Sequence, residues 1–149
     1  MLVINSVDEM REVGARLGHQ LKVGDLVLLS GPLGAGKTAL TQGIAQALGI
    51  EGVTSPTFVI SRIHPAGSAG IPLVHVDAYR AQGQAAAIFD DLDVESYLPT
   101  HITVVEWGEG LADRLSDQYL EITLAHGIDE NVRALEYVGH GERWAGISL

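Results

Sequence analysis

Two kinds of hydrophobic pattern alternate along this 149-residue chain. Short, uniformly apolar runs, at 26–30, 73–77 and 102–106, are typical of strands buried on both faces of a parallel sheet. In other segments apolar residues recur at helical spacing, which predicts amphipathic helices, the first over 8–21. The alternation indicates an α/β fold: one domain, 1–149, with a mainly parallel central sheet, an antiparallel portion and helices on both faces.

Weaker signals complete the expected order of elements. Ser6 and Glu9 have the spacing of a capping box, which predicts a helix start there, and Gly49 stands where the second helix should end. The remaining expected elements are strands at 2–4, 58–63, 120–124 and 132–138, a late pairing of 147–149, short helices within 81–100 and at 111–115, and an exposed loop over 65–72.

The segment after the expected strand at 26–30 contains a candidate nucleotide-binding motif. It reads GPLGAGKT and matches G-x-x-x-x-G-K-[ST], the P-loop pattern, at every fixed position. In such a loop backbone amides surround nucleotide phosphates, the lysine reaches the β and γ oxygens, and the hydroxyl ligates Mg²⁺. A chance glycine-rich turn has no need of a strand before it and a helix after it. The residues expected to bind the nucleotide are Gly31, Leu33, Gly34, Ala35, Gly36, Lys37, Thr38 and Ala39.

Two carboxylates end buried strands elsewhere in the chain. Asp77 closes the run LVHVD, and Glu106 closes ITVVE. Because P-loop hydrolases use such acids to hold Mg²⁺ and to orient the attacking water, we expect a magnesium role for at least one of them. An acid at a strand end can also cap a turn, so the choice between the two stays open here. With Lys37 they form the expected catalytic set.

A third segment, SPTF, follows the P-loop helix. Ser55, Pro56 and Thr57 lie where many P-loop proteins keep a loop that senses the γ-phosphate. An ordinary turn into a strand explains the same residues equally well. His75 and Asp77 share one strand face, and a single strand histidine is more often structural than a ligand.

Composition narrows the function classes. The net charge is −10 with only nine Lys plus Arg, which opposes direct binding to nucleic acid. No apolar run approaches the length of a membrane span, and the first residues lack a signal-peptide pattern, so we expect a cytoplasmic protein. Cysteine is absent, which excludes disulfides and a thiol nucleophile.

The lysines and arginines bear on the nucleotide. The chain has two lysines, Lys22 and Lys37, and neither lies in the N/T-K-x-D pattern that reads guanine, so an adenine nucleotide is expected. Nucleotide and small-molecule kinases usually grip phosphates with several arginines of a lid, whereas Arg80 is the one arginine in 78–100. The alternatives are a small-molecule phosphotransferase and a nucleotide-sensing module that barely hydrolyses.

Four segments, taken in order, resemble one family: GPLGAGKT, SPTF, HVDAYR and VEWGE. Their order and spacing are similar to the TsaE (formerly YjeE) family, bacterial ATPases that support threonylcarbamoyladenosine modification of tRNA. The resemblance covers about 6–125. It implies a small P-loop fold, weak hydrolysis of ATP with Mg²⁺, and action on the TsaD and TsaB subunits, which carry out the transfer.

The resemblance also assigns residues. It implies that Thr38 and Glu106 hold magnesium, that Asp77 is needed for hydrolysis and that Ser55, Pro56 and Thr57 form the switch-like segment. Trp107 would lie beside the nucleotide, and Arg80 would either meet phosphate or stabilise the fold. Ser6 and Arg133 are further residues that the fold geometry would bring near the nucleotide.

Two positions depart from the family pattern. Pro32 stands where the family commonly has Asp, and Ala39 where a second Thr is common. Proline has no backbone N–H to offer, and the lost Asp removes a polar contact that could tune hydrolysis or partner docking. The fixed P-loop atoms remain, so these departures bear on the turnover rate more than on nucleotide binding.

Overall fold

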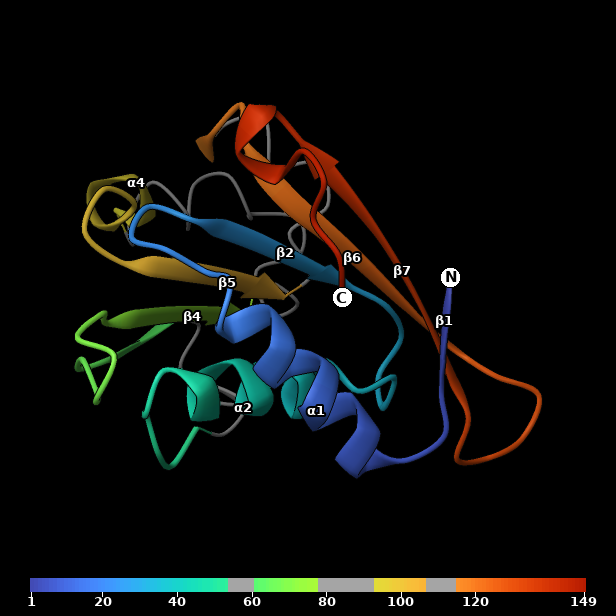
Figure 1. Cartoon of the computed structure of the whole chain (residues 1–149). Helices are drawn as coiled ribbons and strands as arrows, with labels where there is room; N and C mark the ends of the chain where they lie inside the picture. Colours follow the sequence, from blue (N-terminus) through green and yellow to red (C-terminus); the bar gives the residue numbers. More distant parts are fainter. Residues whose placement is uncertain (54–60, 78–92, 107–114) are drawn as a thin grey trace.

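Seven strands form one sheet in the computed structural model, which describes residues 1–53, 61–77, 93–106 and 115–149. Their order across the sheet is β1-β7-β6-β2-β5-β4-β3 (Figure 1). The strands are β1 (Leu2–Ile4), β2 (Leu26–Ser30), β3 (Ser61–His64), β4 (Leu73–Asp77), β5 (Ile102–Glu106), β6 (Tyr119–His126) and β7 (Arg133–His140).

The sheet is parallel in its centre and antiparallel at both sides. Strand β2 pairs in parallel with β5 and β6, and β5 pairs in parallel with β4. The outer pairs β1·β7, β6·β7 and β3·β4 are antiparallel. Both the parallel centre and the antiparallel portion are therefore confirmed. The segment 65–72 connects β3 and β4 as the expected hairpin loop, while 58–60 lie outside the described residues.

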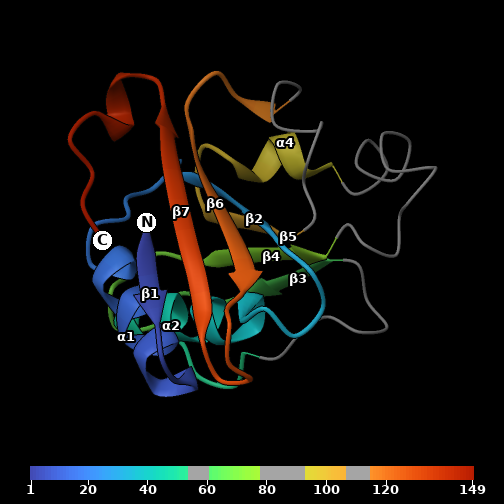
Figure 2. The ribbon, with the colours of Figure 1, turned by 90° about the vertical axis from the view of Figure 1, so that its right-hand side faces the viewer.

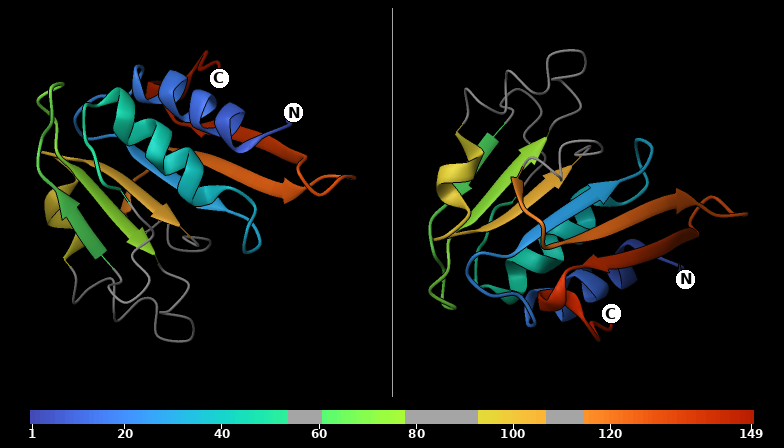
Figure 3. Two further views of the ribbon diagram at one scale, coloured as in Figure 1. Left: turned by 90° about the horizontal axis from the view of Figure 1, so that it is seen from below. Right: turned by 90° about the horizontal axis from the view of Figure 1, so that it is seen from above.

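Two long helices cover one face of the sheet. They are α1 (Val7–Gly18) and α2 (Lys37–Ala47), which lie side by side below the strands (Figures 1 and 3). Helix α1 ends three positions before the predicted end, because the chain already turns toward β2 through hydrogen bonds from Gln20 N–H to Leu17 O and from Leu21 N–H to Gly18 O. Leu21 stays buried in the core.

The start of α1 is set by local chemistry. Ser6 is the N-cap, and its hydroxyl accepts a hydrogen bond from Glu9 N–H at 3.0 Å. The Glu9 carboxylate accepts one from Asn5 N–H at 2.7 Å. The predicted capping box is confirmed, with the returning carboxylate bonded to the residue before the N-cap.

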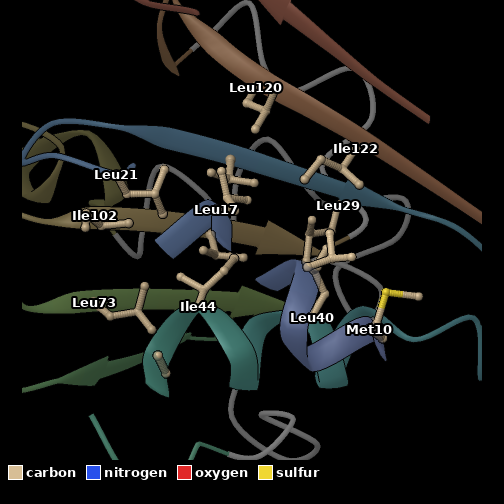
Figure 4. Packing of buried hydrophobic residues seen from close by; sticks show 14 of the residues in the cluster. Met10, Leu17, Leu21, Leu29, Leu40, Ile44, Leu73, Ile102, Leu120 and Ile122 are labelled. Atoms are coloured by element: carbon tan, nitrogen blue, oxygen red, sulfur yellow. The ribbon is translucent and has the colours of Figure 1, made fainter. Parts of the chain in front are cut away.

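The main core lies between these helices and the sheet (Figure 4). Leu17 and Ile44 project from the helices onto Leu29 and Ile122 of the central strands, and all four side chains are fully buried. The helices cross closely: a Cβ at Gly14 would lie 2.2 Å from the carbonyl oxygen of Leu40. This close crossing places the first turns of both helices at one edge of the sheet.

The opposite face carries a second, smaller cluster. Leu28, Val76 and Val105 form it together with Val94 from α4 (Val94–Tyr97), a one-turn helix on that face. Helices on both faces are thus confirmed. Helix α4 lies within the span 81–100 that was predicted to form short helices; the rest of that prediction over 81–92, and 111–114 of the predicted helix at 111–115, lie outside the described residues.

The predicted late pairing of 147–149 is wrong. These residues form no strand, and Ile147 and Leu149 pack instead against the main core. The local reason is a turn after Trp144, in which Ile147 N–H donates a hydrogen bond to Trp144 O at 3.2 Å. The 3₁₀ helix η2 (Glu142–Trp144) precedes the C-terminus and is held by a two-pronged ion pair between Arg143 and Asp25 at 2.7 and 2.8 Å.

Candidate nucleotide-binding site

The glycine-rich loop joins β2 to α2 and depends on unusual backbone angles. Gly31 has a φ of 147°, and a Cβ there would lie 2.5 Å from the carbonyl oxygen of Leu124 on β6. Gly36, with a φ of 109°, is the N-cap of α2. Because glycine has no side chain to cap the helix, the amides of the first turn of α2 are left for another acceptor. Such a helix start favours an anion.

The Lys37 side chain folds back over the loop. Its Nζ donates to Gly31 O at 2.7 Å and to Pro32 O at 2.9 Å, and the residue is buried. Burial lowers the pKa of Lys37, and the nearby Glu106 and Asp77 carboxylates act in the opposite direction. Although Pro32 has no N–H, its carbonyl also accepts from Ala35 N–H at 3.2 Å, so this residue supports the loop through its oxygen.

The predicted P-loop and strand-end residues line one cavity of about 220 Å³. Asp77 and Glu106 are directly paired on the parallel strands β4 and β5, so both carboxylates arrive at the same edge of the sheet. The lining residues are Leu33, Gly34, Gly36, Lys37, Thr38, Ala39, Asp77 and Glu106. Of the other predicted loop residues, Ala35 is fully buried and Gly31 supplies a carbonyl to Lys37. The structure therefore places most of the predicted phosphate-binding residues and both strand-end carboxylates around one cavity.

A buried histidine contacts one of the carboxylates that line this cavity. His75 Nε2 lies 2.6 Å from Glu106 Oε2, and both residues are almost inaccessible to solvent. Sequence analysis treated this histidine as structural and did not connect it with the glutamate. The available signal was its position two residues before Asp77, on the same face of the strand.

A second pocket, of about 230 Å³, adjoins the first and shares Gly34, Gly36 and Ala39 with it. Ser6 and Arg133, the two residues expected near a nucleotide from fold geometry, both line this pocket. The other lining residues, which sequence analysis missed, are Asn5, Val7, Met10 and Asn131. No motif marks them, because the start of α1 and the turn before β7 meet only in the folded chain.

The hairpin of β6 and β7 supports the loop from the side. Arg133 Nε donates to Gly34 O at 3.2 Å, and His126 Nε2 lies 3.2 Å from Leu33 O. Arg133 also donates through its Nη1 to the carbonyls of Glu130 and Val132, which fixes its guanidinium. Arg133 thus links the P-loop to the pocket beside it.

Other predicted site residues lie outside the described part of the chain. They are Ser55, Pro56 and Thr57 of the switch-like segment, together with Arg80 and Trp107. Their assignments stay predictions. In the described ranges no helix is long and apolar enough to cross a bilayer.

Comparison with known proteins decides the family. The profile described as "Threonylcarbamoyl adenosine biosynthesis protein TsaE" matches residues 4–135. The chain belongs to the TsaE family. The match includes the P-loop, both strand-end carboxylates and Arg133, so the cavity lies within the part shared with the family.

Relatives and a solved structure agree with the TsaE assignment. A Streptomyces coelicolor protein named "tRNA threonylcarbamoyladenosine biosynthesis protein TsaE" is 49% identical over 91% of this chain and 94% of its own length. A Bacillus subtilis protein of the same name is 34% identical over 92% of this chain and 84% of its own. The crystal structure of Bacillus subtilis YdiB superposes with a TM-score of 0.76 at 28% identity, covering 97% of this chain and 87% of that one. Both relatives thus carry the name of tRNA threonylcarbamoyladenosine biosynthesis, in agreement with the family.

The donor set of the cavity suits magnesium. Mg²⁺ prefers oxygen ligands, keeps several waters, and is usually held by one or two protein groups plus substrate phosphates. Thr38 offers a hydroxyl, and Glu106 and Asp77 offer carboxylates. Among the described residues no cluster of three or more histidine, aspartate or glutamate side chains forms an all-protein metal cage. A cation shared with nucleotide phosphates therefore fits this site.

Proposed function

We propose that this chain binds ATP with Mg²⁺, hydrolyses it slowly, and thereby supports threonylcarbamoyladenosine modification of tRNA by acting on the complex of TsaB and TsaD. One observation carries the proposal. Lys37, Thr38, Asp77 and Glu106 line a single cavity at the start of α2. Each of these groups has a known use in phosphate-bond hydrolysis.

The phosphates of ATP would bind against the loop and the first turn of α2. The helix start favours negative charge, and Lys37 adds a cation. The Lys37 amine now donates to two neutral carbonyls, Gly31 O and Pro32 O. Hydrogen bonds to an ionised phosphate are stronger, so the amine would exchange these acceptors for phosphate oxygens.

The two carboxylates would have different roles, one at the metal ion and one at the attacking water. Thr38 and Glu106 would hold Mg²⁺, which when bound supplies positive charge to the β- and γ-phosphate oxygens. Asp77, paired with Glu106 in the strand register, would orient the attacking water and accept its hydrogen bond. Slow intrinsic hydrolysis is what the resemblance to the TsaE family implies.

The nucleoside would occupy the adjoining pocket. Val7 and Met10 offer apolar surface to a base, while Ser6, Asn131 and Arg133 offer hydrogen-bonding groups around it. A volume of about 230 Å³ next to the phosphate cavity suits the unphosphorylated part of ATP. Adenine is favoured because the sequence lacks the pattern that reads guanine.

The proposed role is that of a partner protein. The net charge of −10 opposes direct contact with tRNA. ATP binding and hydrolysis would instead alter the cycle of TsaB and TsaD, while those subunits carry out the transfer. We expect the protein to act in the cytoplasm.

The test is release of phosphate from ATP, measured alone and with TsaB and TsaD. We expect slow Mg²⁺-dependent release that changes when both partners are present. Lys37→Ala should abolish it, and Lys22→Ala, which removes the other, exposed lysine, should leave it intact. Transfer of phosphate to a small-molecule acceptor, or multiple-turnover tRNA modification by TsaB and TsaD without this chain, would contradict the proposal.

A further inference from the structure

His75 is a polar side chain in a place that favours apolar ones. It lies in the middle of β4, whose other residues before Asp77 are Leu73, Val74 and Val76, and it is fully buried. Its neighbour in register on β5 is Val104. Burying an imidazole in such surroundings costs free energy unless hydrogen bonds offset it. A valine or leucine would suit the strand better, so the histidine requires another explanation.

The hydrogen bonds of His75 point to one partner. Nε2 lies 2.6 Å from Glu106 Oε2, whereas Nδ1 has no hydrogen-bond partner among the described residues. An ionised carboxylate is only an acceptor, so Nε2 carries the hydrogen and donates it. The imidazole thus makes one hydrogen bond, from Nε2 to the carboxylate of Glu106.

The register explains how this bond aims the carboxylate. Asp77 pairs with Glu106, and His75 pairs with Val104, so the histidine stands two pairs behind the glutamate on the same face of the sheet. The bond takes Oε2 of Glu106 back toward the core. Glu106 also lines the phosphate cavity, so Oε1 is the oxygen left for a ligand there.

We propose that His75 is a positioning residue that holds the Glu106 carboxylate in the orientation required to bind the Mg²⁺ of the nucleotide. This inference rests on the proposed function, because it takes Glu106 as a magnesium ligand. Partners that hydrogen-bond a metal-binding carboxylate restrict its orientation before the metal arrives. Loss of such a partner typically weakens metal binding on the order of tenfold or more.

The test is the magnesium-dependent part of ATP affinity, measured by calorimetry with excess Mg²⁺ and again with EDTA. The ratio of the two dissociation constants isolates the metal contribution without any need for turnover. In His75→Leu we expect this ratio to fall on the order of tenfold, with the affinity in EDTA unchanged. His75→Gln keeps an N–H donor at similar reach, and we expect it to restore most of the ratio.

Two further variants separate positioning from stability. His64→Leu removes a neighbouring buried histidine on β3 that does not line the cavity, and it should leave the ratio unchanged. In a Glu106→Gln background, His75→Leu should produce no further change, because the histidine acts through that carboxylate. Thermal unfolding of each variant reports folding, and the glutamine variant keeps the test valid if the leucine variant fails to fold.

The outcomes distinguish the positioning role of His75 from the magnesium-binding role of Glu106. An unchanged ratio in folded His75→Leu, with a reduced ratio in Glu106→Gln, would overturn the positioning role and leave the proposed function intact. An equal fall in His75→Gln and His75→Leu would also overturn it, since the donor would then be irrelevant. A wild-type ATP affinity that ignores Mg²⁺, or a Glu106→Gln ratio equal to that of wild type, would overturn the metal assignment itself.

Discussion

The two sides of the sheet are built differently. Strands β2, β5 and β4 run in parallel and are buried at every position, and their carboxyl ends supply the P-loop, Glu106 and Asp77. Strands β6, β7 and β1 pair antiparallel, lie side by side (Figure 2), and include exposed side chains such as Val138. We infer that the parallel side provides reactive groups and the antiparallel side supports the loop and forms the adjoining pocket.

The largest difference between the two sides of the sheet should appear in the rate of ATP hydrolysis. Asp77→Asn should lower ATP hydrolysis by roughly 10²–10⁴-fold, because a positioned acid–base group contributes about that much. Glu106→Gln should also lower it, because a neutral amide binds Mg²⁺ less well than a carboxylate. Glu136→Gln, which removes an exposed carboxylate from β7, is the control and should match wild type. Phosphate release at saturating ATP checks this. Full activity in both strand-end variants would remove the proposed distinction between the two sides.

The next largest difference should appear in the free energy of unfolding when apolar side chains are shortened. Leu29→Ala on β2 should lower the free energy of unfolding by about 2–5 kcal/mol, because a fully buried leucine leaves a cavity. Val138→Ala on β7, where the side chain is 55% exposed, should change it by less than about 0.5 kcal/mol. Urea unfolding measures both. Equal losses would show that the antiparallel side is packed as tightly as the parallel one.

A smaller effect is expected at Arg133. Arg133→Ala removes the hydrogen bond to Gly34 O and one wall of the adjoining pocket. A net contribution of about 0.5–1.5 kcal/mol predicts ATP binding weaker by roughly two- to tenfold. Arg16→Ala, at an exposed site in the last turn of α1, is the matched control. ATP binding is measured by titration. If Arg133→Ala and Arg16→Ala both bound ATP like wild type, Arg133 would have no supporting role at the loop.

The smallest effect concerns pH and His64 on the outer strand β3. Burial lowers the pKa of His64, and His75 and Arg62 lower it further. Between the ordinary value of about 6.5 and the lowered one, the unfolded chain binds a proton that the folded chain does not, so stability falls as pH drops through this window. His64→Leu should reduce the loss of unfolding free energy between about pH 8, which lies above this window, and about pH 5.5, which lies below the ordinary pKa of histidine. An identical loss in both proteins would exclude this contribution.

Local patterns explain what could be predicted from the sequence. The capping box at Ser6, the buried strands and the helix after the glycine-rich loop depend on neighbouring residues, and each was confirmed as an element. The placement of Asp77 and Glu106 at one cavity followed from a general property of parallel strands. These features required no knowledge of distant contacts beyond the direction of the strands.

Long-range register explains what could not be predicted. The bond between His75 and Glu106 joins residues 31 positions apart and depends on how β4 aligns with β5. The pairing expected for 147–149 was wrong because Ile147 and Leu149 pack against the main core, a long-range contact that no local pattern indicates. Asn131 joins the second pocket through the turn before β7, which no motif marks.

The loop between β2 and α2 is proposed to bind the phosphates of ATP, and one pair of lysines tests this binding directly. Calorimetric titration with Mg²⁺ and ATP should show binding by wild type and equal binding by Lys22→Ala. Lys37→Ala should bind roughly 10- to 100-fold more weakly, because a hydrogen bond to a charged group contributes about 1.5–3 kcal/mol. Wild-type affinity in a folded Lys37→Ala protein would contradict the account.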